Sequence, residues 1–196
     1  MALTPVQAID AVNGVFGRHA GRRALHAKGT LCRGSFTATP AAAQLTIAAH
    51  MRGATIPATV RFSNGSGDPG HPDWAPEPRG LAIKLYLHDG SRTDIVAVSS
   101  PRFPVSTPDA FIELVLAQGA GEGDPTDDPS AAWPRQRQRV TAGTLEITEL
   151  EVQRETGDDV LVFDPTRITA GIELSDDPVL QFRRAVYSES VARRTA

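Results

Sequence analysis

Residues 80–98, GLAIKLYLHDGSRTDIVAV, contain two segments of alternating apolar residues joined by a polar turn. In the first segment a large aliphatic side chain occupies every second position: Leu81, Ile83, Leu85 and Leu87. This period of two predicts a strand with one buried face. Residues 88–91 supply a turn, and residues 93–98 predict the return strand. The stretch is therefore expected to fold as an antiparallel β-hairpin.

The rest of the chain predicts more short strands around this hairpin. They are expected at residues 30–39, 44–49, 56–63, 143–152 and 160–163. Short strands at this spacing, without long helices between them, are typical of an antiparallel barrel or sandwich. Helices are predicted after Thr4-Pro5, from Thr107 to about Gln118, and from Asp176 towards Arg194. The predicted class is α+β: an antiparallel β-barrel core with N-terminal, mid-chain and C-terminal helices.

The length of 196 residues suits a single domain with its own core. Within it, residues 119–130 are rich in glycine, proline and aspartate. Their carboxylates lack the spacing and the terminal glutamate of an EF-hand loop. We therefore expect an exposed flexible linker at 119–130 inside one domain that spans 1–196.

The composition argues against several functional classes. A net charge of -3 gives no electrostatic basis for binding nucleic acid. The single cysteine, Cys32, can build neither a disulfide framework nor a cysteine-based zinc site. No secretory signal pattern and no apolar run of membrane-spanning length is visible. A cytoplasmic protein without a membrane span is the expectation.

Two distant places in the chain carry residues suited to chemistry. His26 precedes the first predicted strand and follows the basic residues Arg22 and Arg23. A lone histidine is more often structural or solvated than functional. In the last predicted helix, Arg183 and Tyr187 are four residues apart and share a face. A guanidinium there favours an anionic phenolate oxygen, which can ligate ferric haem iron.

Read together, several motifs resemble the core of the haem catalases, in order and at plausible spacing. They are ALHAKG at 24–29, VRFS at 60–63, PRGLAIKLY at 78–86, FDP at 163–165 and GIELSDDPVLQFR at 171–183, followed by Tyr187. The match covers nearly the whole chain after the first predicted helix. The small bacterial catalase-related peroxidases are the most similar group. The resemblance implies a single catalase-like haem domain over residues 1–196.

The resemblance also implies roles for individual residues. His26 matches the distal acid–base histidine, and Ser63 matches the serine that orients it. Tyr187 matches the iron ligand. Arg23 and Arg61, and more loosely Arg194, match arginines that pair with the propionates of haem b. Phe111 matches a phenylalanine near the porphyrin face, and Arg183 matches the arginine beside the phenolate of the iron ligand.

Two departures from the family pattern affect the expected activity. The distal asparagine of the family falls at Ser99, which lacks the amide donor. This substitution favours a peroxidase over a fast catalase. Moreover, little more than the 119–130 segment separates Phe111 from Trp133, so part of the barrel is missing. A barrel without some of its strands leaves two open edges and an apolar interior, which favours a rearranged closure or a homo-oligomer.

Three functions therefore stay open at the level of sequence. The first is a haem peroxidase or weak catalase that uses hydrogen peroxide or organic peroxides together with a small-molecule reductant. The second is a non-catalytic protein of degenerate catalase fold that binds haem or another hydrophobic ligand. The third is a β-barrel protein that binds no haem.

Overall fold

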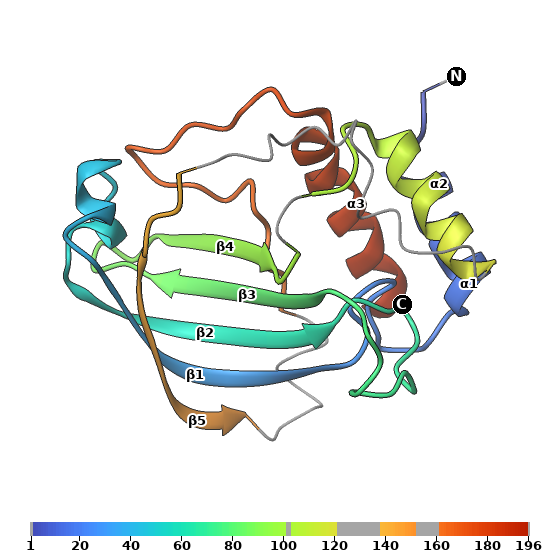
Figure 1. Cartoon of the computed structure of the whole chain (residues 1–196), viewed down its shortest axis with the longest axis horizontal. Helices are drawn as coiled ribbons and strands as arrows, with labels where there is room; N and C mark the ends of the chain where they lie inside the picture. The colour runs from blue at the N-terminus through green and yellow to red at the C-terminus, as the bar shows by residue number, and fades with distance from the viewer. Residues whose placement is uncertain (1, 101–102, 121–137, 152–160, 196) are drawn as a thin grey trace.

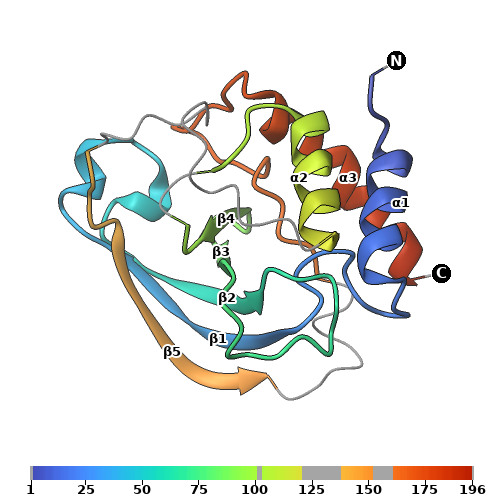
Figure 2. The same ribbon diagram turned by 45° about the vertical axis from the view of Figure 1, so that its right-hand side comes forward.

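The computed structural model describes residues 2–100, 103–120, 138–151 and 161–195. Its centre is a five-stranded antiparallel sheet in the order β4-β3-β2-β1-β5. The strands are β1 Gly29–Ala38, β2 Thr55–Asn64, β3 Arg79–Tyr86, β4 Arg92–Val98 and β5 Gly143–Glu151. The sheet curls but does not close, so β4 and β5 are its two edges (Figures 1 and 2). The expected α+β class with an incomplete barrel is confirmed.

Three helices gather at one end of the sheet (Figures 1 and 2): α1 Pro5–Phe16, α2 Pro108–Gly119 and α3 Pro178–Thr195. Thr4 and Gln7 form a reciprocal capping box at the start of α1, as the Thr4-Pro5 pair predicts. A small apolar cluster joins α1 and α2 through Ala8, Val12, Ile112 and Val115, and the α3 residues Phe182 and Val186 pack against it. No helix within the described ranges is long and apolar enough to span a bilayer.

The main core lies on one face of the sheet. Alternate residues of the central strands are buried there, including Cys32, Val60 and Leu85. On β5 a register shift opposite Arg33 and Gly34 inserts one extra residue, so that Leu145, Ile147 and Leu150 all turn towards this face.

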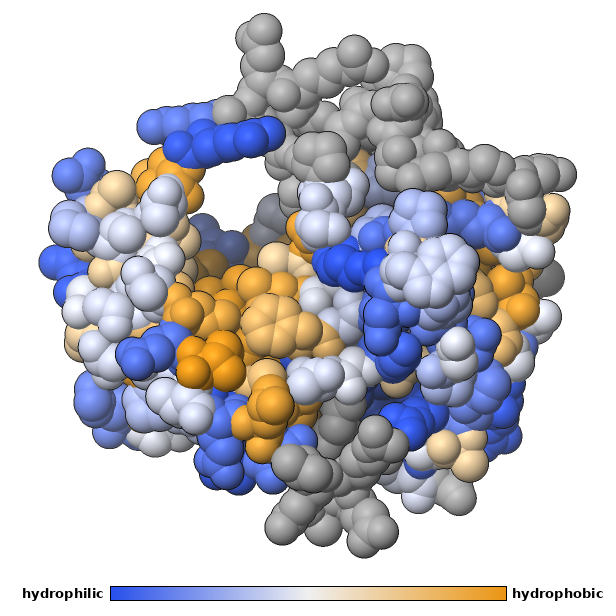
Figure 3. All heavy atoms as spheres, turned by 60° about the horizontal axis from the view of Figure 1, so that its bottom comes forward, coloured by the Kyte–Doolittle hydropathy of each residue, from blue (hydrophilic) through white to orange (hydrophobic). Residues whose placement is uncertain are grey.

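The core face of β5 is poorly covered by the residues that the structure describes. Ile147 is 39% exposed and Leu150 is 61% exposed although both point towards the core side. Figure 3 shows a hollow with hydrophobic side chains gathered along it. The apolar interior expected from an unclosed barrel is thus partly open.

The strand predicted at 44–49 is wrong. The chain forms two short 3₁₀ turns there, η1 Ala42–Gln44 and η2 Ala49–Met51. Leu45 and Ile47 are 67% and 78% exposed, so their alternation does not reflect a buried strand face. The hydroxyl of Thr46 accepts from the Ala48 N–H and donates to the distant Gly171 carbonyl, which holds the segment in a turn.

The strand predicted at 160–163 and the linker predicted at 119–130 lie only partly within the described residues. Residues 161–163 form no strand, and residue 160 lies outside the described ranges. Of the predicted linker at 119–130, Gly119 is the last residue of α2, and residues 121–130 lie outside the described ranges.

A buried ionic cluster ties the segment that leads to α3 onto the sheet. Lys84 of β3 and Asp94 of β4 are buried, and Lys84 Nζ lies 2.6 Å from Asp94 Oδ1. Arg167 pairs with the other carboxylate oxygen, and the Asp94 N–H donates to the Arg167 carbonyl at 3.1 Å. The 161–171 segment is therefore fixed along the edge of β4, which sets where α3 begins.

Candidate active site

A cavity of about 870 Å³ lies between the helices and the face of the sheet opposite the main core. Its wall is mainly apolar, with residues from α1, α2, α3 and the strands β2 to β4. The volume is in the range of cofactor and ligand sites in proteins. Seven of the residues singled out in the sequence for polar or ionic roles line it: Arg23, His26, Arg61, Ser63, Arg183, Tyr187 and Arg194.

His26 lies in the cavity wall and has an unusual backbone conformation. Among the described residues other than glycine it alone has a positive φ, at 56°. This region is disfavoured for residues with a side chain, so the surrounding contacts must stabilise it. The His26 N–H donates to the Gly65 carbonyl at 3.2 Å, and the next residue, Ala27, donates to the Ser66 carbonyl at 3.1 Å.

The hydrogen bonds of the His26 ring determine which nitrogen carries the proton. Nδ1 lies 2.7 Å from the carbonyl oxygen of Asn64 and 3.1 Å from the hydroxyl of Ser63. Since a carbonyl oxygen can only accept, we assign the proton of the neutral ring to Nδ1. Nε2 then carries the lone pair, as a general base requires.

His26 rests directly against β3 because Gly80 has no side chain. A Cβ atom at Gly80 would lie 2.5 Å from Ser63 Oγ and 2.8 Å from His26 Nδ1. Both distances are far below van der Waals contact. The glycine in the motif at 78–86 therefore makes room for the imidazole and its serine partner.

Burial and nearby positive charge keep His26 neutral. Burial is the largest cause that lowers its pKa, followed by the charge of Arg61 and then those of Arg183 and Arg23. The hydrogen bond to the Asn64 carbonyl opposes them, and the resulting pKa is about 4. At neutral pH the ring can therefore accept a proton.

Tyr187 and Arg183 face the same cavity from α3. Arg183 Nη1 donates to the Tyr187 hydroxyl at 3.4 Å, one helical turn away. The Arg183 guanidinium also lies over the ring of Phe103, 5.3 Å from its centroid. Phe103 in turn stacks on Phe111 at 5.9 Å, and both rings line the cavity. The predicted phenylalanine is thus present in the wall.

The other arginines bring positive charge to the cavity from separate elements. Arg61 of β2 is only 3% exposed, and Gly29 of β1 leaves space for it, since a Cβ there would lie 2.5 Å from Arg61 Cζ. Arg23 and Arg194 both donate to the Leu161 carbonyl, at 2.6 and 3.2 Å.

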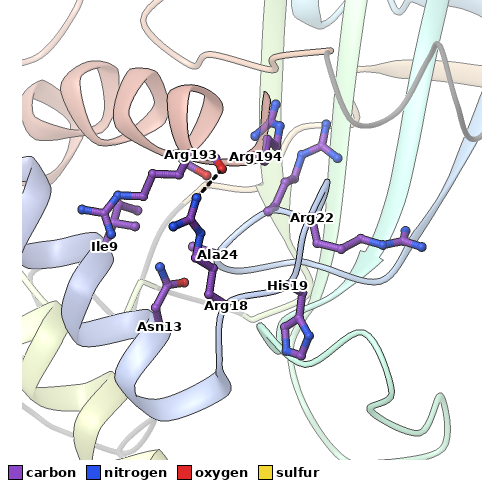
Figure 4. Close-up of a pocket in the computed structure, with 10 residues that line it drawn as sticks. Ile9, Asn13, Arg18, His19, Arg22, Ala24, Arg193 and Arg194 are labelled. Atoms are coloured by element: carbon purple, nitrogen blue, oxygen red, sulfur yellow. Dashed lines mark hydrogen bonds between the residues drawn. The ribbon is translucent and has the colours of Figure 1, made fainter. Parts of the chain in front are cut away.

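A smaller pocket adjoins this basic wall between α1, the segment after it and the end of α3 (Figure 4). There Arg18 donates to the Arg193 carbonyl at 3.0 Å, while Arg193 pairs with Asp10 and Glu189. This pocket is only about 10 Å³ in volume, room for a single water molecule. We therefore place the candidate ligand site in the large cavity.

The structure does not bring Ser99 into the cavity. Ser99 is exposed, and its hydroxyl accepts from the Arg79 N–H at 2.8 Å. The neighbouring Ser100 lines the cavity instead. Val96, Ala97 and Val98 of β4 also line the cavity. Ser99 and Ser100 both follow the end of β4 at Val98, so no strand periodicity in the sequence selects one of them over the other.

Comparison with known proteins gives consistent matches. A family model described as Catalase matches residues 2–139. A catalase-related peroxidase of Mycolicibacterium paratuberculosis is 36% identical over 299 residues, which cover 98% of this chain and 95% of the relative. A catalase-related peroxidase of Synechococcus elongatus is 26% identical over 302 residues, covering 98% of this chain and 89% of the relative.

A larger relative matches only a part of the chain. The catalase of Methanosarcina barkeri is 33% identical over 113 residues, 57% of this chain and 22% of the relative. The alignments with the two peroxidases extend over 299 and 302 residues, whereas this chain has 196. Those relatives therefore contain stretches that have no counterpart here.

Proposed function

Because the chain belongs to the catalase family and is thus an oxidoreductase that acts on peroxide, we propose that it is a haem-dependent peroxidase. In this proposal His26 is the acid–base group and Tyr187 is the iron ligand. The observation that supports it most strongly is that one apolar cavity collects both residues together with Arg23, Arg61 and Arg183. These residues lie far apart in the sequence.

The chemistry of the cavity wall fits haem b. Its apolar surfaces suit a porphyrin, and the rings of Phe103 and Phe111 supply flat contact area. Arg23, Arg61 and Arg194 would pair with the propionate carboxylates. Tyr187 would ligate the iron, with Arg183 stabilising its phenolate oxygen. When bound, haem supplies the redox chemistry of its iron.

The protein supplies proton transfer through His26. The lone pair on Nε2 can accept the proton of a bound peroxide, and the same nitrogen can return it to the departing oxygen. The Asn64 carbonyl and the Ser63 hydroxyl keep the ring oriented while this happens. The low pKa of His26, about 4, keeps the base form available across the neutral range.

The distal side favours a peroxidase over a fast catalase. Ser99 stands where the family carries an amide donor, and its side chain points to the Arg79 backbone instead. Ser100 offers only a hydroxyl to the cavity. The substrates would be hydrogen peroxide or an organic peroxide, with a small-molecule reductant completing the cycle.

A second candidate function is a non-catalytic protein that binds haem or another hydrophobic ligand. The open sheet favours it, because an unclosed barrel leaves the core face of β5 exposed at Ile147 and Leu150. The two functions differ in whether His26 matters for turnover.

Peroxide consumption separates them. We expect His26→Ala, in protein supplied with haem, to consume peroxide at least about a hundredfold more slowly than the unsubstituted protein. His88→Ala, in the β3–β4 turn, is the matched control and should keep the full rate. Equal rates for the unsubstituted protein and His26→Ala would leave the binding function as the better account.

A further inference from the structure

The loop between β2 and β3 shapes the hydrogen bonds of His26. β2 ends at Asn64 and β3 begins at Arg79, and these two residues pair with each other in the sheet. The loop that connects them passes His26. Carbonyl oxygens of three successive residues of this connection, Asn64, Gly65 and Ser66, accept from Nδ1 of His26, N–H of His26 and N–H of Ala27. The geometry of His26 therefore depends on how firmly residues 64–66 are held.

Arg79 holds this connection through four hydrogen bonds. Its Nη1 donates to Asn64 Oδ1 at 3.1 Å and to Glu77 Oε1 at 2.8 Å. Its Nη2 donates to the carbonyls of Asp73 and Ala75, at 2.8 and 2.6 Å. The planar guanidinium thus joins both ends of the loop and its middle. A lysine ammonium cannot reproduce this fork of donors.

The residues that bond to Arg79 also form hydrogen bonds that hold residues 64–66. Asn64 also donates from Nδ2 to Asp73 Oδ1 at 3.1 Å, so both polar atoms of its side chain are fixed. The second oxygen of Glu77 accepts from the Ser66 N–H at 2.9 Å. Lys28 adds an ion pair of 2.8 Å to Asp73. Two of the three carbonyls that hold His26 and Ala27 thus belong to residues tied to Arg79 directly or through Glu77.

We propose that Arg79 is a positioning residue for His26, an inference that rests on the acid–base role proposed for that histidine. Arg79 holds the Asn64 side chain, and Asn64 is the residue whose backbone carbonyl selects the proton on Nδ1 and leaves Nε2 as the base. Without the guanidinium, the Asn64 N–H still donates to the Lys28 carbonyl at 3.2 Å, but the Asn64 carbonyl is held less firmly against Nδ1. The Ser63 hydroxyl, 3.1 Å from Nδ1, then becomes the main partner. A hydroxyl can donate as well as accept, so it does not select one tautomer.

The test compares Arg79→Gln with Arg92→Gln, an arginine on β4 that packs over Tyr86 away from His26. The full chain, labelled with ¹⁵N-histidine and without added haem, is examined by long-range ¹H–¹⁵N NMR at pH 7. We expect only the Nδ1–H tautomer of His26 in the unsubstituted protein and in Arg92→Gln. Arg79→Gln should show a mixture of both tautomers. His26→Ala assigns the signal.

Turnover gives a second readout. In haem-supplied protein Arg79→Gln should lower kcat for peroxide roughly tenfold, the scale of losing an outer hydrogen-bond partner, with little change in KM. If Arg79→Gln does not fold, Arg79→Lys carries the same test, because it keeps the charge and loses the fork. An unchanged single tautomer in a folded Arg79 variant would overturn the inference.

The outcomes distinguish this inference from the proposed function. An unchanged tautomer together with an inactive His26→Ala would reject the role of Arg79 and keep the role of His26. A mixed tautomer together with a fully active His26→Ala would confirm that Arg79 orients the ring and reject the catalytic role of the histidine.

Discussion

The imidazole of His26 lies against the backbone of Gly80, where a Cβ atom would come within 2.8 Å of Nδ1. This contact joins the start of β3 to His26, which lies three residues before the start of β1 at Gly29. It explains why a glycine stands at the second position of β3, although glycine weakens strands.

Gly80→Ala is predicted to displace His26 while the sheet stays folded. The added methyl group overlaps Ser63 Oγ and the imidazole, so the ring must leave its hydrogen bond to Asn64. We expect peroxide turnover to fall by at least about tenfold. Gly14→Ala is the control, because a Cβ there meets nothing within 4 Å and replaces a glycine inside α1. It should raise stability by about 0.5–1 kcal/mol, read from thermal unfolding.

The activity is predicted to persist into acid. Arg61 on β2, Arg183 on α3 and Arg23 before β1 face His26, and with burial they lower its pKa to about 4. Because burial is the largest cause and remains when haem is bound, the acid limb of kcat/KM against pH should lie well below 6.5. A limb near 6.5, the ordinary histidine value, would contradict the assignment of His26 as the base.

The lowered pKa of His26 also predicts how the stability of the protein changes with pH. The unfolded chain binds a proton at His26 below about pH 6.5, whereas the folded chain binds it only near pH 4. The contribution of His26 is therefore present above pH 6.5 and is lost as the pH falls towards 4. Urea unfolding at pH 7 and pH 5 should show His26→Ala losing less stability on acidification than the unsubstituted protein.

Asp94→Asn is predicted to loosen the attachment of α3. It removes the carboxylate that pairs with buried Lys84 and with Arg167, and an uncompensated buried charge costs about 3–5 kcal/mol. The free energy of unfolding from urea titration measures this loss. Glu113→Gln, exposed on α2, should change it little. Equal effects of the two substitutions would contradict a structural role for the cluster.

The open edge of the sheet leads us to propose a homo-oligomer. Leu150 is 61% exposed although it points to the core side of β5, and the related peroxidases contain stretches that this chain lacks. A second copy is the partner that would cover this surface. Leu150→Lys should shift the mass measured by light scattering towards the monomer, whereas Thr144→Lys, on the opposite face of β5, should not. A monomeric unsubstituted protein would reject the proposal.

The sequence was most informative where local patterns and tertiary packing agree. The hairpin at 80–98 was predictable because alternation, turn and return strand lie within one stretch. The strand at 44–49 was not, because the hydroxyl of Thr46 bonds to the Gly171 carbonyl, a contact between segments far apart in sequence. For the same reason the hydrogen bond from His26 to the backbone carbonyl of Asn64 was not predictable, since no side-chain pattern reveals which carbonyl a histidine will bond.

Some residues of the candidate site were likewise predictable from the sequence, and others were not. The family motifs selected His26, Ser63, Arg61 and Tyr187, and the structure places all four in the wall of one cavity. The position next to the end of β4 was harder to predict. Ser99 was selected by position in the motif, yet Ser99 bonds to the Arg79 backbone and Ser100 lines the cavity. Both serines follow the end of β4, so neither motif spacing nor strand alternation decides between them.

Haem ligation by Tyr187 is the central claim, and the absorbance spectrum of protein supplied with haem tests it most directly. The unsubstituted protein and Tyr86→Phe, the only other tyrosine of the chain, should show the same Soret and charge-transfer bands of a tyrosinate-bound ferric haem. Tyr187→Phe should lose them. Identical spectra for Tyr187→Phe and Tyr86→Phe, or no haem uptake by the unsubstituted protein, would contradict the account.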